Sequence, residues 1–199
     1  MSESRSFPRI FLWGFAIVII LAAVAAYVIR QANQSRADIP VHGTVPAFEF
    51  VNQDGEPYGS EELQGKITIL DFIFTNCEGA CPVMSRAMSG LYEDFSNTDR
   101  VQFVSISVDP ARDSLAALRK YAKRYEVTDD RWNFLRTEID SVKWLAREGF
   151  SLSDEFPMGH STRFVLIDRN LRIRGYYRSD DDASIGVLKT HIRELARQG

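Results

Sequence analysis

The chain has 199 residues, of which 45% are hydrophobic and 26% are charged, and its formal net charge is -3. This composition is typical of a globular protein rather than a disordered one. The length suits one ordinary domain with an appendage. Because the charge is close to balanced, there is no broad basic surface, and nucleic acid is not an expected partner.

The first predicted element is an apolar run over residues 10–29, which contains no charged residue. A run of this length can cross a bilayer as a helix, and it exceeds the ~7–15-residue core of a cleaved signal peptide. We therefore predict a transmembrane signal anchor there, preceded by a short tail over residues 1–9. Cleavage after one of the alanines between Ala22 and Ala26 is the competing interpretation. Arginines flank both ends, so the positive-inside rule gives little orientation.

A polar linker is predicted over residues 30–38, and residues 39–199 have the length of a single domain. Asp54 and Gly55 stand between two short alternating stretches and indicate a hairpin. Residues 66–75 form a continuous β-branched and aromatic run, which is typical of a central buried strand. From Pro82 onward, apolar residues recur at helical spacing.

The rest of the chain alternates between strand and helix patterns. Ser114 is a candidate helix cap, and Gly149 is a candidate helix end. Such alternation, closed by a strand pair and a helix, predicts an α/β sandwich with helices on both faces of the sheet. A hairpin, then βαβ, then ββα is the thioredoxin-like arrangement. Further strands are predicted over 100–109, 131–137, 162–168 and 171–178, and further helices over 114–125, 140–149 and 183–198.

Both cysteines of the chain, Cys77 and Cys81, stand where the buried strand ends and the helix begins. Open α/β sheets build their sites at this edge. A structural disulfide would close only a short loop and would stabilise the fold little. A domain of this size can also bury an adequate core without one. Two roles therefore remain for this pair of cysteines: thiol–disulfide exchange and metal binding.

In the redox interpretation, the helix N-terminus favours the reactive thiolate. Cys77 would be the exposed attacking thiol and Cys81 the resolving one. Asp71 is a carboxylate within an apolar strand, and thioredoxins carry a buried aspartate at the same offset, where it can accept a proton. A hydrogen-bonded structural aspartate is the equal alternative.

The usual redox motif has two residues between its cysteines, whereas three intervene here. A peroxidase needs only one reactive cysteine, so it does not require the pair.

In the metal interpretation, two thiolates form a soft site that selects Cu(I), zinc or an iron–sulfur centre. A third ligand must then come from elsewhere, and the chain has three histidines. His42 lies in the linker before the first strand, and His191 is expected on the solvent face of the last helix. His160 directly precedes a predicted strand, in a loop that a thioredoxin-like fold brings to the thiols. His160 is therefore the candidate third ligand.

Three segments resemble the Sco/SenC copper proteins. "FIFTNCEGACPVM" is similar to the family's F-x-x-C-x-x-x-C-P segment. "VSISVDPARDSLAALRKYA" is similar to its S-x-D-P-x-x-D element, and "GHSTRFVLIDRNLRIRGYY" to its H-S/T-x-x-x-x-L-I-D strand. The three segments occur in the same order as in the family, and the resemblance extends from about Val45 to the C-terminus. An N-terminal anchor is also typical of the family.

The resemblance implies that Cys77, Cys81 and His160 bind a copper ion. It further implies a membrane-anchored copper chaperone whose domain lies on the extracytoplasmic side. Its partner would be subunit II of cytochrome c oxidase, whose dinuclear copper site would receive copper or be kept reduced. Copper binds only the reduced pair, so oxidising surroundings would control loading. A membrane-anchored thiol–disulfide oxidoreductase that keeps partner cysteines reduced is the alternative, and enzymatic activity stays open.

Three other residues have simpler interpretations. Met84 and Met88 fall in step with Leu91 and Phe95, so we expect them in the core rather than as thioether ligands. Asp109 ends a strand, where it can cap the next turn, and an indirect role beside the metal site stays open.

Overall fold

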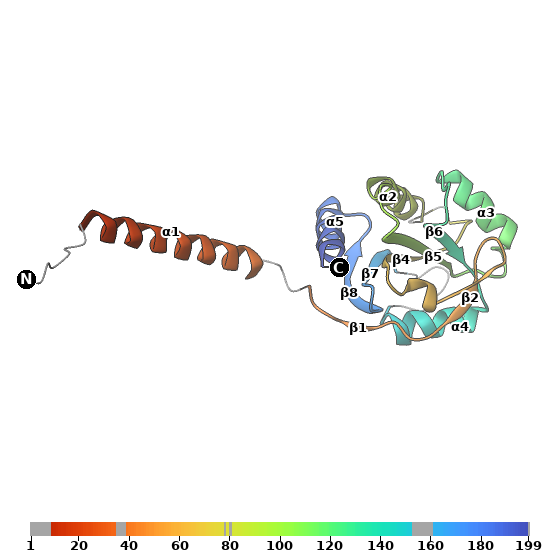
Figure 1. Cartoon of the computed structure of the whole chain (residues 1–199). Coiled ribbons are helices and arrows are strands. Elements are labelled where there is room, and N and C mark those ends of the chain that lie inside the picture. The colour runs from red at the N-terminus through yellow and green to blue at the C-terminus, as the bar shows by residue number, and fades with distance from the viewer. Residues whose placement is uncertain (1–8, 35–38, 78, 80, 153–160, 199) are drawn as a thin grey trace, which may run out of the picture. The chain divides into compact units, whose positions relative to one another are not determined.

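The computed structural model describes residues 9–34, 39–77, 79, 81–152 and 161–198. The chain separates into two units, Met1–Asp38 and Ile39–Gly199. The first unit contains helix α1 (Arg9–Gln34), which continues past residue 29 into the predicted linker (Figure 1). Within the described ranges, no helix combines the length and the apolar character that a membrane crossing requires.

The second unit is built on a six-stranded sheet with the order β1-β8-β7-β4-β5-β6. Strands β4, β5 and β6 are parallel, whereas β7 is antiparallel to β4, β8 to β7 and β1 to β8. A separate hairpin pairs β2 (Glu49–Val51) with β3 (Pro57–Gly59), and Gly55 has a positive φ of 89° in its turn. The strands of the large sheet are β1 (Gly43–Thr44), β4 (Ile67–Ile73), β5 (Val101–Ser107), β6 (Trp132–Leu135), β7 (Arg163–Ile167) and β8 (Arg172–Arg178).

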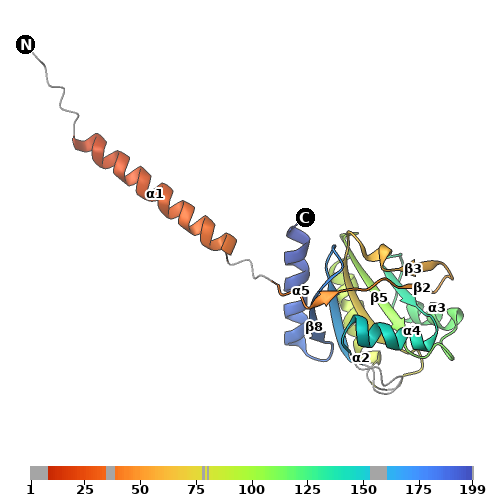
Figure 2. The same cartoon turned by 90° about the horizontal axis from the view of Figure 1, so that it is seen from below.

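Helices cover both faces of the sheet, as Figures 1 and 2 show. On one side lie α2 (Cys81–Asp94), α3 (Leu115–Arg124) and α5 (Asp182–Arg197). On the other side lies α4 (Ile139–Trp144), which continues as a π-helical turn, Leu145–Gly149. A short 3₁₀ turn, Glu61–Leu63, follows the hairpin. The predicted α/β class, with helices on both faces, is confirmed.

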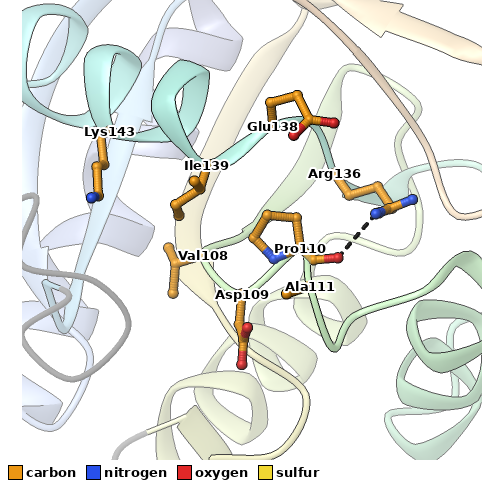
Figure 3. Close-up of a pocket in the computed structure, with 8 residues that line it drawn as sticks. All are labelled: Val108, Asp109, Pro110, Ala111, Arg136, Glu138, Ile139 and Lys143. Atoms are coloured by element: carbon orange, nitrogen blue, oxygen red, sulfur yellow. Dashed lines mark hydrogen bonds between the residues drawn. The ribbon is translucent and has the colours of Figure 1, made fainter.

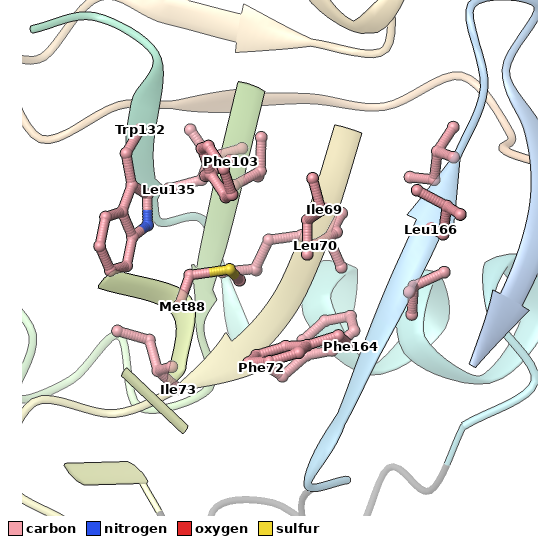
Figure 4. Close-up of a cluster of buried hydrophobic side chains, with 14 of the residues drawn as sticks. Ile69, Leu70, Phe72, Ile73, Met88, Phe103, Trp132, Leu135, Phe164 and Leu166 are labelled. Carbon is pink, nitrogen blue, oxygen red and sulfur yellow. The ribbon is translucent and has the colours of Figure 1, made fainter. Parts of the chain in front are cut away.

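The central strands are apolar because both of their faces are covered. Every residue of β4 and of β5 is buried, which explains the continuous rather than alternating pattern of the sequence. Figure 4 draws part of this core, with Phe72 of β4, Phe164 of β7 and Met88 of α2 among its side chains. Met84 and Met88 are both 0% exposed, so their predicted place in the core is confirmed.

Two predicted helix ends are also confirmed. The Ser114 hydroxyl accepts a hydrogen bond from the Ala117 amide at 3.2 Å, which caps α3. Gly149 closes the π-helical turn, where a Cβ would stand only 3.1 Å from Pro46 and 2.9 Å from Leu145. Close packing against Pro46 therefore explains why glycine stands there.

Candidate dithiol site

The two cysteines flank the turn between β4 and α2. Strand β4 ends at Ile73, the Cys77 amide donates to the Phe74 carbonyl at 3.3 Å, and Cys81 is the first residue of α2. Cys77 is half-buried and Cys81 is buried, and no disulfide joins them in this structure. The expectation that Cys77 is the more exposed thiol is thereby confirmed.

The surroundings of Cys81 oppose ionisation. Burial raises the pKa of its thiol, and the neighbouring Cys77 thiol and the Asp71 carboxyl act in the same direction. A backbone hydrogen bond from Phe74 opposes them without reversing the result. The helix N-terminus therefore does not make Cys81 acidic, contrary to the simplest expectation for that position. A bound metal would have to displace the proton.

Asp71 of β4 is fully buried, in register with Ser105 of β5, and its carboxyl is close enough to Cys81 to act on that thiol. Among the residues that the structure describes, neither of its carboxylate oxygens has a partner in hydrogen-bonding geometry. Burial raises the pKa of Asp71 to about 7, and the Ser105 hydroxyl acts in the opposite direction. Ser105 is thus the neighbour that can stabilise the charged form of Asp71, and a structural aspartate and a proton acceptor both stay predictions. A pKa near 7 is what the proton-acceptor role would need.

A second buried aspartate, Asp113, lies behind the turn that carries Cys77, and no role was predicted for it from the sequence. Its carboxylate accepts hydrogen bonds from the Thr75 hydroxyl at 2.6 Å and from the Ser107 hydroxyl at 2.6 Å. It also accepts from the Thr75 amide at 3.2 Å. In the sequence, Asp113 is the last residue of the S-x-D-P-x-x-D element that begins at Ser107.

Asp109 lies beside a cavity of about 530 Å³ at the carboxyl ends of β5 and β6 (Figure 3). Its backbone carbonyl accepts from the amides of Arg112 and Asp113, so it closes the turn after β5 through the main chain. Its carboxylate pairs with Arg112 at 3.4 Å. Across the cavity, Arg136 donates to the Pro110 carbonyl at 2.9 Å. The cavity is lined by both signs of charge, from Asp109, Arg136, Glu138 and Lys143.

The three histidines have different positions. His160 lies outside the described residues. His42 is exposed and packs edge-on against Tyr176, next to β1, and strands β8 and β7 separate β1 from β4 in the sheet. His191 is half-buried, and its Nδ1 shares a 2.7 Å hydrogen bond with the Tyr177 hydroxyl.

The expectation that His191 lies on the solvent face was wrong, because α5 turns that side of the helix toward β8. Within the described ranges, no three His, Cys, Asp or Glu side chains gather closely enough to hold a metal ion. The described part of the site is therefore the Cys77–Cys81 pair with Asp71.

Comparison with known proteins links this geometry to one family. The SCO1/SenC family model matches residues 37–196. The SCO1 protein homolog of Bacillus subtilis (strain 168) is 36% identical over 136 residues, covering 64% of this chain and 70% of the relative.

Two solved structures share the fold. A SCO1/SenC family lipoprotein from Bacillus anthracis str. Ames has a TM-score of 0.74 and 30% identity, covering 80% of this chain and 98% of that one. BsSco has a TM-score of 0.70 and 28% identity, covering 78% and 95%. Because these matches extend over the dithiol turn and nearly all of the second unit, the chain belongs to the SCO1/SenC family.

Proposed function

We propose that this chain is a copper chaperone. In this proposal Cys77, Cys81 and His160 hold a copper ion as cargo for the dinuclear copper centre in subunit II of cytochrome c oxidase. The observation that carries it is a pair of thiols at one sheet edge, one half-buried and one buried, in a chain of this family. Two thiolates suit a soft ion such as Cu(I), and an imidazole adds affinity for Cu(II).

The different exposure of the two thiols suits transfer as well as binding. Cys77 is accessible enough for a partner's ligand to approach, whereas Cys81 is buried and its thiol pKa is raised by that burial. Copper binding must therefore release a proton from Cys81, and reprotonation of Cys81 favours release. Copper would leave by ligand exchange that begins at Cys77.

Copper titration of the reduced protein tests the proposal, with absorption and paramagnetic resonance as readouts. Reduced protein is expected to take up one copper ion, and protein oxidised to the Cys77–Cys81 disulfide is expected to take up none, because ligation needs thiolates. Equal uptake by both forms would contradict the chaperone function.

Thiol–disulfide exchange is the second candidate, favoured by the position of Asp71 close to the buried thiol. The Cys77 thiolate would attack a partner disulfide and release one partner thiolate, which takes up a proton. The Cys81 thiolate would then attack the Cys77 sulfur, release the second partner thiol and leave the Cys77–Cys81 disulfide. BsSco, a member of the Sco family of cytochrome c oxidase assembly proteins, has a disulfide switch.

We also propose that residues 10–29 anchor the chain in a membrane, with residues 39–199 on the extracytoplasmic side. The support is the sequence itself, because twenty consecutive residues carry no charge. The similar Bacillus anthracis protein is a lipoprotein.

A further inference from the structure

We propose that Asp113 is a positioning residue for the dithiol. Its buried carboxylate fixes the peptide unit between Phe74 and Thr75, and through that unit it sets the turn that places Cys77 beside Cys81. Asp113 lies between β5 and α3, far from the cysteines in sequence, and is 0% exposed. This inference deepens the proposed function, because it concerns the same two thiols.

The carboxylate of Asp113 is fully occupied by donors. Oδ1 accepts from the Thr75 hydroxyl at 2.6 Å, Oδ2 accepts from the Ser107 hydroxyl at 2.6 Å, and the Thr75 amide lies 3.2 Å from both oxygens. A buried carboxylate needs such donors to stay buried. The two hydroxyl contacts at 2.6 Å are at the short end of the range for O–H···O hydrogen bonds. The contact with Thr75 is therefore stiff.

The peptide unit that Asp113 holds is also the one that starts the cysteine turn. Its N–H is the Thr75 amide, which donates to Asp113, and its C=O is the Phe74 carbonyl, which accepts from the Cys77 amide at 3.3 Å. A peptide unit is planar, with its N–H and C=O pointing in opposite directions. Fixing the N–H toward Asp113 therefore aims the C=O at Cys77. Phe74 also provides the backbone hydrogen bond to Cys81.

The segment that carries Asp113 is itself braced. The amides of Arg112 and Asp113 both donate to the Asp109 carbonyl, at 3.0 and 2.9 Å, and the Asp109 amide donates to the Ser107 hydroxyl at 3.2 Å. The Val108 amide donates to the Ile73 carbonyl at 2.8 Å, which joins this segment to the end of β4. These hydrogen bonds hold the Asp113 carboxylate in a fixed position. The carboxylate can therefore fix the position of the turn that carries Cys77.

The test is the equilibrium of the reduced full-length chain with a glutathione redox buffer. Glutathione disulfide accepts two electrons from the Cys77 and Cys81 thiols, which lose two protons and join, and it leaves as two glutathione molecules. Aligned thiols have a higher effective concentration toward each other. We expect Asp113→Asn to lower the equilibrium constant for the protein disulfide about tenfold, which is about 30 mV in reduction potential.

Ser107→Ala is the matched control, because it removes two hydrogen bonds of the same loop, to the Asp113 carboxylate and from the Asp109 amide, and leaves the contact between Asp113 and Thr75 in place. It is expected to lower the stability to urea but to leave the disulfide equilibrium within about twofold, since only the Thr75 contact leads to the cysteines. If Asp113→Asn moves the equilibrium no further than Ser107→Ala does, Asp113 is merely structural and the proposal is overturned.

If Asp113→Asn does not fold, the same disulfide equilibrium is measured for Thr75→Val instead. This substitution removes only the 2.6 Å hydroxyl contact, so we expect a shift of about two- to threefold in the same direction. If both variants fold, the double variant should shift no further than Asp113→Asn alone, because the two residues act through one contact. Additive shifts, or no shift for Thr75→Val, would overturn the proposal. None of these readouts uses copper, so a failure of the chaperone function leaves the result intact.

Discussion

Two aspartates near the dithiol are both 0% exposed, yet they have opposite surroundings. The Asp113 carboxylate accepts from two hydroxyls and an amide, whereas Ser105 is the group that opposes the effect of burial on Asp71. The donors to Asp113 come from the cysteine turn and the end of β5, which are distant in sequence. Only the fold brings them together, so the chemistry of each carboxylate follows from its neighbours rather than from residue type.

Asp71 should make the stability of the protein depend on pH. Its pKa is about 7 in the folded state and near 3.8 when exposed, so between these values only the folded state keeps the proton. Stability must then fall as pH rises from about 4 to about 7, by ~4 kcal/mol in total. Asp71→Asn should lack this decline, so its stability relative to the wild type should rise across that range.

Urea unfolding of both proteins from pH 4 to pH 8 measures the difference. Asp99→Asn is the control, because Asp99 is exposed in a loop, and its difference from the wild type should stay within about 0.5 kcal/mol. A pH-independent difference for Asp71→Asn would show that Asp71 is ionised throughout.

His160→Ala should separate the copper chaperone from the redox enzyme. Loss of the imidazole should weaken Cu(II) binding at least about a hundredfold, since even the outer partners of metal ligands contribute about 10–100-fold. Cu(I) should suffer less, because two thiolates can still hold it. Thiol exchange should survive, because it proceeds between sulfurs.

Competition titrations with each copper oxidation state, alongside a thiol-exchange assay, provide the measurement. His42→Ala is the matched control, because His42 is exposed and lies next to β1, and it should behave as the wild type does. Unchanged Cu(II) binding with lost exchange in His160→Ala would favour the oxidoreductase.

At the scale of elements, α2 combines a core face with the start of the dithiol site. Met88 is 0% exposed, whereas Val83 is 43% exposed in the first turn of the same helix. Met88→Ala should cost about 2–5 kcal/mol of stability through lost burial and a residual cavity. Val83→Ala should cost less than about 0.5 kcal/mol. Urea unfolding with an unchanged m-value checks both, and equal costs would mean that α2 packs differently.

The elements that the sequence predicted well are those with a strong local pattern. The continuous apolar run of β4, the helical spacing after Pro82 and the cap at Ser114 all depend on neighbours in sequence. The less predictable features depend on distant contacts. The hydrogen bond between His191 and Tyr177 of β8 holds that side of α5 toward the sheet, and the contact between Asp113 and Thr75 joins residues 38 positions apart.

The order of strands in the sheet explains why the loops after β4, β5 and β6 all lie near the dithiol site. Strands β4, β5 and β6 are parallel and adjacent, so their carboxyl ends share an edge. The cysteine turn follows β4, the Asp113 loop follows β5, and the Arg136 side of the cavity follows β6. The buried core fixes these three ends relative to one another, which lets a contact in one loop set the geometry of another.

How the chain is held in the cell depends on whether the apolar run over residues 10–29 stays attached. If residues 10–29 form an uncleaved anchor, the full chain should stay with membranes after alkaline carbonate extraction. Residues 39–199 expressed alone should remain in solution, because the apolar run is then absent. Mass spectrometry of the purified full-length protein should find the original N-terminal segment, and protease added outside the cytoplasm should digest the domain. An N-terminus that begins between Ala22 and Ala37 would show cleavage and contradict the anchor, whatever the outcome of the copper experiments.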